Sequence, residues 1–159
     1  MIPSQVNNNI YQCIKETYGP NTLRTVRKLE KVLKKLARFR NHLTFAIKCK
    51  TSNIQPKGLR LKCGLRTKKT KAIIEQAERK LLNEHTHTVT RTIQNLNNDR
   101  AVYEDELKNV LNEDIFAALK EKLRNREDEE FKKVKSRQRN KFEKLLRLQT
   151  DVECLPSNA

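Results

Sequence analysis

The clearest structural signal in this chain lies in residues 22–49, which read TLRTVRKLEKVLKKLARFRNHLTFAIKC. Apolar residues recur there three and four positions apart, a spacing that places them along one face of an α-helix. This stripe consists of Leu23, Val26, Leu29, Leu33, Leu36, Leu43 and Ile47. A helix of about 28 residues spans roughly 40 Å, so we expect it to need a second helix alongside.

The composition extends this helical signal to the whole chain. Only 3 Gly and 4 Pro occur among 159 residues, and Trp is absent. This balance favours long helices over sheets that are cut by turns. Aromatic residues make up only 5%, so the core should be a narrow seam of Leu, Ile and Val. We therefore predict an all-α fold, either a bundle or a coiled-coil-like arrangement.

Turn-forming residues divide this helical pattern into segments. Pro56, Gly58 and Gly64 predict a long connection after the first helix, with a strand-like piece at residues 59–61. The next helix should return antiparallel to the first, although residues 86–92 (THTVTRT) favour a strand. Asparagines near residue 98 are expected to end it, and Asn112 looks like a new N-terminus. The predicted helices are about 22–49, 68–98, 100–111 and 114–149.

The predicted domain organisation is simple. Residues 1–21 are polar and uneven, which indicates a weakly ordered leader with a short helix near Ile10 to Ile14. Residues 22–149 are expected to form a single basic helical domain. Residues 150–159 should be a frayed tail or a linker.

Positive charge is concentrated in one third of the sequence. Residues 22–71 hold 17 Lys and Arg against one acid, Glu30, whereas the rest of the chain is neutral overall. Unneutralised, these bases would repel one another, and phosphates neutralise them well because binding releases condensed counterions. We therefore expect RNA or duplex DNA to bind here through its phosphate backbone. The predicted binding residues are Arg38, Arg40, Lys48, Lys50, Lys57, Arg60, Lys62, Arg66, Lys68, Lys69 and Lys71.

Charges also segregate in the last third of the chain. Residues 99–130 carry 11 acids against 6 bases, and residues 132–147 then carry 8 bases against Glu143 alone. The second stretch is either a solvated face that pairs with the acidic segment or a secondary basic patch. That patch would consist of Lys132, Lys133, Lys135, Arg137, Arg139 and Lys141. The alternative function is a helical oligomerisation module, in which the acidic segment of one copy pairs with the basic block of another.

Several other classes of function find no support in the sequence. Phosphate-loop, hydrolase and metalloprotease motifs are absent, so we expect no enzyme and no cofactor. The spacing of Cys13, Cys49, Cys63 and Cys154 does not suit zinc, which predicts reduced packing thiols.

Neither a secretory signal nor a long apolar stretch occurs. We therefore expect a soluble intracellular protein, nuclear or cytoplasmic, and rank a membrane surface behind nucleic acid as a partner. Phe39 and Phe45 are the only aromatic residues in the basic block, and we expect them to pack between helices and not to stack on bases.

The connection also carries a resemblance to a known family. The residues involved are Asn41-His42-Leu43, Pro56-Lys57-Gly58-Leu59-Arg60-Leu61-Lys62, Ala77, Leu81-Leu82 and Arg139-Asn140-Lys141-Phe142-Glu143-Lys144-Leu145. Over about residues 25–147 the chain resembles the helical segment that precedes the reverse transcriptase domain of Penelope-like retroelements. The family's polymerase and endonuclease motifs are not found here. The resemblance implies an accessory or N-terminal module that holds element RNA or target DNA near a polymerase supplied elsewhere.

Overall fold

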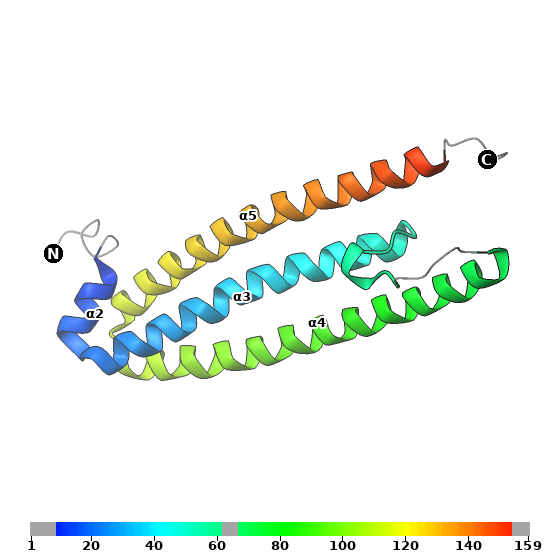
Figure 1. The fold of residues 1–159 in the computed structure, drawn as a ribbon. Coiled ribbons are helices and arrows are strands. Elements are labelled where there is room, and N and C mark those ends of the chain that lie inside the picture. The colour runs from blue at the N-terminus through cyan, green and yellow to red at the C-terminus, as the bar shows by residue number, and fades with distance from the viewer. Residues whose placement is uncertain (1–8, 62–66, 154–159) are drawn as a thin grey trace. The chain divides into compact units, whose positions relative to one another are not determined.

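The computed structural model describes residues 9–61 and 67–153, and this part of the chain is almost entirely helical. Its elements, in order, are α2 (Ile10–Tyr18), α3 (Pro20–Thr51), the 3-10 turn η1 (Lys57–Leu59), α4 (Lys68–Val110) and α5 (Glu113–Glu153) (Figure 1). Neither described stretch contains a strand. The predicted all-α class with long helices is confirmed, whereas the strand-like piece at residues 59–61 is replaced by the end of η1 and an extended residue, Arg60.

The first long helix begins two residues before the predicted start at residue 22. Pro20 occupies its first turn, where a missing N–H costs nothing and the fixed φ angle already suits a helix. Gly19 precedes it with φ 98°, a left-handed value that glycine adopts freely and that turns the chain out of α2. At the other end α3 runs to Thr51, and Asn53 takes φ 52° just beyond it.

The break predicted after residue 98 is wrong, because α4 continues as one helix to Val110. Its threonine-rich part remains helical, since Thr86, Thr88 and Thr90 donate their hydroxyl protons to backbone carbonyls four residues earlier, at 2.8, 3.0 and 2.9 Å. These bonds satisfy the hydroxyls without an excursion from helical geometry. Leu96 is buried just beyond them, so tertiary packing outweighs the weak helix propensity of this segment.

The new N-terminus predicted at residues 112–114 is confirmed. Helix α5 begins at Glu113, and the Oδ1 atom of Asn112 accepts a hydrogen bond from the backbone N–H of Asp114 at 2.8 Å. Glu113 and Asp114 place two acids in the first turn, where negative charge is favourable. The helix extends to Glu153, four residues beyond the predicted end.

The described residues group into two compact units, and the single basic domain predicted over residues 22–149 includes parts of both and stays a prediction. Unit 1 contains residues 9–39 and 92–134, and unit 2 contains residues 40–61, 67–91 and 135–153. Helices α3, α4 and α5 each contribute one part to each unit. Each unit has a hydrophobic cluster of its own.

Unit 1 has the larger core, and α2 is part of it. Ile10 and Ile14 of α2 are fully buried against α3 and α5 residues such as Leu29 and Leu119. Residues 10–18 therefore form an integral helix of this unit, longer than the short helix near Ile10 to Ile14 that was predicted within a weakly ordered leader. The predicted apolar stripe of residues 22–49 is confirmed in this unit, since its members from Leu23 to Leu36 are buried.

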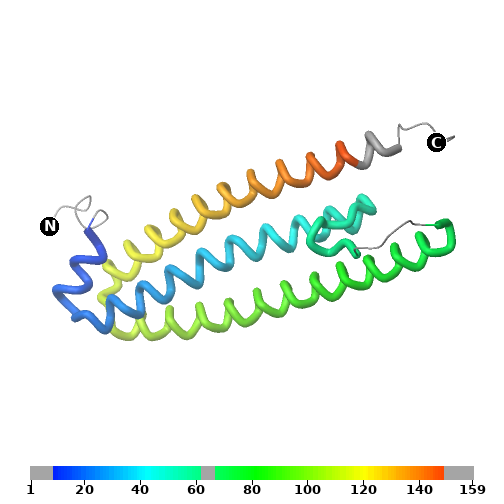
Figure 2. The backbone as a smooth tube through the Cα atoms, viewed as in Figure 1, coloured from blue at the N-terminus to red at the C-terminus, as the bar shows by residue number. Residues whose placement is uncertain are grey.

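The core of unit 2 is small. Ala46, Cys49 and Leu82 are buried there, and two phenylalanines pack against them. Ile47, which the sequence analysis placed on the apolar stripe, is 49% exposed. Figure 2 shows the chain doubling back after α3 toward α4, which brings the following turn against the helices of this unit.

Candidate nucleic-acid interface

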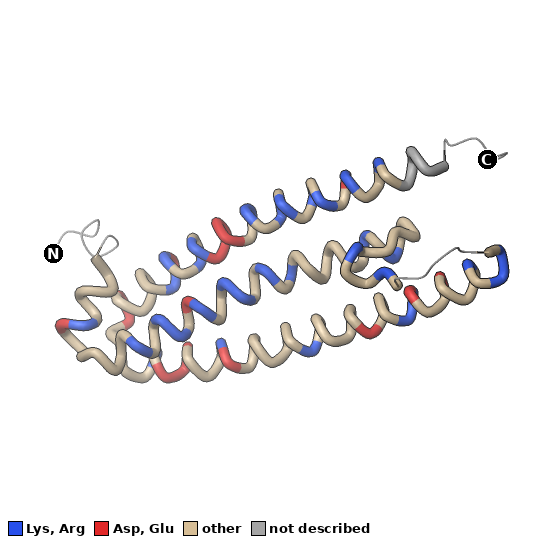
Figure 3. The backbone as a smooth tube through the Cα atoms, in the orientation of Figure 1, with Lys and Arg blue, Asp and Glu red and all other residues tan. Residues whose placement is uncertain are grey.

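The two units differ sharply in charge. Unit 1 holds 16 Lys and Arg against 13 Asp and Glu, a formal +3. In unit 2, the residues whose side chains the structure describes include 17 Lys and Arg against only four acids, a formal +13. Lys and Arg occur on all three helices of unit 2 and on its turn (Figure 3). One-to-one pairing with those four acids would leave 13 of these cations without a carboxylate partner.

Unit 1 combines its charges internally. The Glu30 carboxylate lies in a network in which Oε2 accepts from the Tyr11 hydroxyl and Oε1 accepts from Arg126 Nη1, each at 2.5 Å. Lys34 Nζ lies 3.4 Å from the same Oε1 atom. Burial acts to raise the pKa of Glu30, but the hydrogen bonds from Tyr11 and Arg126 outweigh it and lower that pKa. Burial and the bond to Glu30 raise the pKa of Tyr11 above its usual value of 10.

Most of the predicted binding residues lie together in unit 2. Arg38 is the exception, since it lies in unit 1 and its Nε atom is 2.9 Å from Oε1 of Glu130. Lys62 and Arg66 lie outside the described residues. The remaining eight are exposed side chains of unit 2: Arg40, Lys48, Lys50, Lys57, Arg60, Lys68, Lys69 and Lys71.

The predicted secondary patch divides between the units. Lys132 and Lys133 lie in unit 1, close in sequence to the acids of α5. Lys135, Arg137, Arg139 and Lys141 are exposed residues of unit 2. Two stretches more than 60 residues apart in the sequence, about 57–71 and 135–141, therefore belong to the same compact unit.

Helices α3 and α5 run parallel in unit 2, and aromatic packing joins them. The Phe45 and Phe142 rings meet edge to face, with centroids 6.3 Å apart. Lys48 Nζ lies 5.9 Å from the Phe142 centroid, and Lys141 Nζ lies 5.8 Å from the Phe45 centroid. Phe45 thus packs between helices, as expected from the sequence, and the contact brings one lysine of α3 and one lysine of α5 to the same place.

The start of α4 adds positive charge where a helix already has a positive end. The N-terminus is capped by Thr67, whose carbonyl accepts from the Lys71 N–H at 2.7 Å and whose Oγ1 accepts from the Thr70 N–H at 3.3 Å. Lys68, Lys69 and Lys71 then fill the first turn, which contains no acid. Three cations at this end of a helix oppose the macrodipole, and an anion there would relieve the repulsion.

The turn before α4 is fixed by Gln55. Its Nε2 atom donates to the backbone carbonyls of Leu59 and Glu78, both at 2.9 Å, which ties the turn to itself and to α4. Arg60 Nε donates back to the Gln55 carbonyl at 3.3 Å. Lys57 and Arg60 therefore project from an anchored turn and not from a free loop.

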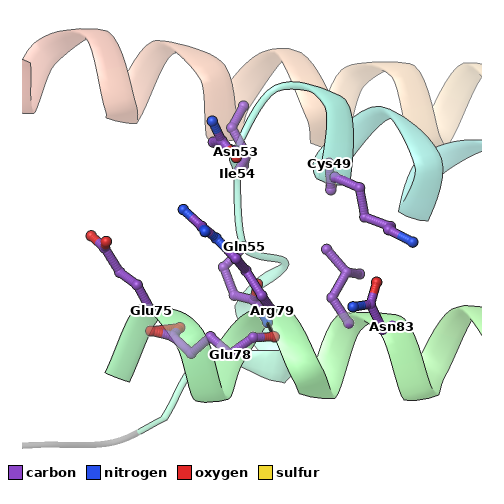
Figure 4. A pocket seen from close by; sticks show the side chains of 10 residues that line it. Cys49, Asn53, Ile54, Gln55, Glu75, Glu78, Arg79 and Asn83 are labelled. Atoms are coloured by element: carbon purple, nitrogen blue, oxygen red, sulfur yellow. Dashed lines mark hydrogen bonds between the residues drawn. The ribbon is translucent and has the colours of Figure 1, made fainter. Parts of the chain in front are cut away.

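A cleft of about 490 Å³ lies between the end of α3, the turn and α4 in unit 2 (Figure 4). Cys49 and Ile54 contribute apolar surface, and burial raises the pKa of the Cys49 thiol to about 11. Glu75 and Glu78, two of the four acids of the unit, line the cleft beside Arg79. Lys50 also lines the cleft, so two acids stand against two cations there and the cleft adds no net positive charge to the unit.

Five further bases of unit 2 are not among the predicted contact residues: Arg79, Lys80, Arg91, Lys144 and Arg147. Lys144 and Arg147 belong to the stretch of eight bases at residues 132–147. Glu75 and Glu78 lie just before Arg79 and Lys80 in the sequence, so a count of net charge by segment did not single out these two bases. Among the described residues, no group of three or more His, Cys, Asp or Glu side chains could hold a metal ion. None of the described helices combines the length and the apolar character needed to cross a membrane.

Comparison with family models, curated proteins and solved structures found no match to this chain.

Proposed function

We propose that this protein is a nucleic-acid-binding module that contacts the phosphate backbone of RNA or duplex DNA through unit 2. The observation that carries the proposal is the excess of 17 Lys and Arg over four acids in that unit. A polyanion neutralises such an excess and releases its condensed counterions as it binds. Unit 1, with 13 acids of its own, serves as the packed support.

The contact residues are the exposed bases on four elements of unit 2. Lys48 and Lys141 lie at the α3–α5 contact, where each ammonium faces the other helix's phenyl ring. Lys57 and Arg60 lie on the turn that Gln55 anchors, and Lys68 begins α4. Cations on an anchored turn or helix lose less conformational freedom on binding than cations on a disordered basic tail, which favours their contact with the phosphate backbone.

Salt dependence gives the first test. If eight of the exposed bases contact phosphates, log Kd should rise with log salt with a slope of about 6 to 7. Fluorescence anisotropy of a labelled duplex and a labelled RNA hairpin between low and moderate salt measures this slope. Absence of binding at low salt would refute the proposal.

A matched pair of variants locates the surface. Replacing Lys57, Arg60 and Lys68 by Gln removes three charges from unit 2 and should reduce the slope by about 2 to 3 and weaken binding. The control replaces Arg24, Lys28 and Lys31 by Gln, which removes three exposed charges from α3 in unit 1. Because both variants lose the same net charge, equal effects would place the contacts elsewhere.

The resemblance to the helical segment of Penelope-like retroelement proteins suggests the setting of this function. In that setting the module would hold element RNA or target DNA for a polymerase supplied elsewhere. Two-colour binding experiments with element-like structured RNA and unrelated RNA of equal length would test it. Equal affinity for both would leave backbone binding intact and remove support for the retroelement setting.

Self-association is a second candidate function. Exposed apolar side chains of unit 2 favour it. Ile47, Ile73 and Leu148 are 49%, 68% and 52% exposed. Light scattering over a range of protein and salt concentrations separates two modes of assembly. Apolar association persists at high salt, whereas pairing of acidic and basic surfaces weakens as salt screens them.

A further inference from the structure

A second cleft of unit 2, of about 260 Å³, lies among four elements. α3 contributes His42 and Phe45, and α4 contributes His85. α5 contributes Gln138 and Lys141, and the turn around η1 completes the wall with apolar surface. The cleft lies within the unit that carries most of the positive charge.

Gln138, one of the residues that line this cleft, has an unsatisfied polar atom. Its Nε2 atom lies 2.9 Å from His42 Nδ1, at hydrogen-bond distance. Its Oε1 atom is buried and has no hydrogen-bond partner among the residues that the structure describes. Buried acceptors of this kind are rare because each forfeits its bonds to water, so an N–H group that reached this atom would gain a hydrogen bond without displacing one.

The other walls define the ligand more closely. Phe45 and Leu59 offer apolar surface, and Lys141 Nζ lies 5.8 Å from the Phe45 ring centroid. A suitable ligand is flat, carries an N–H group on its edge and bears negative charge near Lys141. A nucleotide combines these properties, since every base has polar edges, apolar faces and a phosphate linked to it.

We infer that this cleft takes one unpaired base of a nucleic acid bound to unit 2. The inference rests on the proposed function and adds a preference to it: the base edges of a perfect duplex are already paired, so a bulge, loop or single strand binds better. The alternative orientation of the Gln138 amide would present an N–H in place of the carbonyl. Each base edge offers both donors and acceptors, so the preference for an unpaired base holds for either orientation.

The probe is an RNA duplex with one bulged nucleotide, compared with the same duplex carrying an abasic nucleotide at the bulge. Both probes have the same number of phosphates, so contacts to the backbone cancel in the comparison. We expect the bulged base to bind the wild-type protein roughly threefold to tenfold more tightly, as one hydrogen bond to an otherwise unpaired group implies. Competition anisotropy at fixed salt measures the ratio.

Gln138→Leu should abolish this ratio while keeping the affinity for the abasic duplex. The matched control is Gln76→Leu, which changes an exposed glutamine on α4 of the same unit, outside this cleft, and should keep the ratio. Circular dichroism checks that both variants are folded.

Equal affinities of the wild-type protein for the two probes would overturn the inference and leave the proposed function intact. Because this comparison uses only the wild-type protein, it does not depend on the folding of a variant. A ratio retained by a folded Gln138→Leu variant would also overturn it. Binding of neither probe would refute the proposed function itself.

Discussion

Replacing Glu30 by Gln removes the charge from the only acidic side chain between residues 22 and 71 while it keeps the shape of that side chain. Glu30 joins three elements of unit 1, because it lies on α3 and accepts hydrogen bonds from Tyr11 of α2 and Arg126 of α5, each at 2.5 Å. Its side chain is only 13% exposed, so solvent screens the charge weakly.

The expected loss of stability follows from these contacts. A hydrogen bond to a charged group contributes about 1.5–3 kcal/mol, roughly twice a neutral one. The Gln side chain retains a neutral bond with Tyr11 and loses the ion pair with Arg126, whose side chain is 41% exposed and regains water. We therefore expect Glu30→Gln to lower the free energy of unfolding by about 2 kcal/mol. That corresponds to about 4–8 °C in Tm.

Urea unfolding followed by circular dichroism at pH 7 measures this change. Glu16→Gln is the matched control, since Glu16 is an exposed residue of α2 that accepts a hydrogen bond only from its own helix, from Gln12. A loss below about 0.5 kcal/mol for Glu30→Gln, the size typical of a neutral surface change, would refute the reasoning. An equal loss for the control would assign the effect to net charge.

Four further predictions concern single side chains. The hydrogen bonds to Glu30 lower its pKa against the opposing effect of burial. The stability that the Glu30 carboxylate contributes is therefore complete above about pH 4.5 and is lost as the pH falls through the lowered pKa. In an acid titration, the free energies of unfolding of the wild-type and Glu30→Gln proteins should converge there. Tyr11 behaves in the opposite sense: burial and Glu30 raise its pKa, so stability is complete below pH 10 and declines above it, which Tyr11→Phe should abolish in an alkaline titration. Ile14→Ala should cost about 2–5 kcal/mol in urea unfolding, because the side chain is fully buried, and a cost under 1 kcal/mol would mean that α2 does not pack in solution. Burial raises the pKa of Cys49 to about 11, so mass spectrometry at pH 8 should find it alkylated roughly a hundredfold more slowly in the folded protein than in urea, and equal rates would contradict its burial.

The sequence by itself determined the helices. The apolar spacing of residues 22–49 predicted α3 to within two residues at each end, because periodicity is a local property of a long amphipathic helix. Asn112 marked the start of α5 because a side-chain cap acts within three residues. The same reasoning failed at residue 98, since polar asparagines weaken a helix locally but Leu96 and the neighbouring core hold it.

Tertiary structure decided how the charge is distributed. A count by segment found the basic block of residues 22–71, but α3 divides between the units, so Arg38 meets Glu130 while Lys57 and Arg60 lie in the other unit. The parallel course of α3 and α5 brings residues 135–141 to the same unit, a pairing almost a hundred residues apart in sequence. Local sequence cannot encode such a pairing, because it depends on which apolar faces the helices bury together.

The proposed binding of nucleic acid depends on two features, the basic side chains and the Gln138 amide, and the sequence determined only the first. The sequence determined that phosphate-binding side chains exist, since their types and number can be read directly. Only the folded chain placed Gln138 beside His42 with one polar atom buried and unpaired, and only burial identified α2 as part of a core. The physical reason is that hydrogen-bond satisfaction and burial are properties of the neighbours that packing supplies, and those neighbours are distant in sequence.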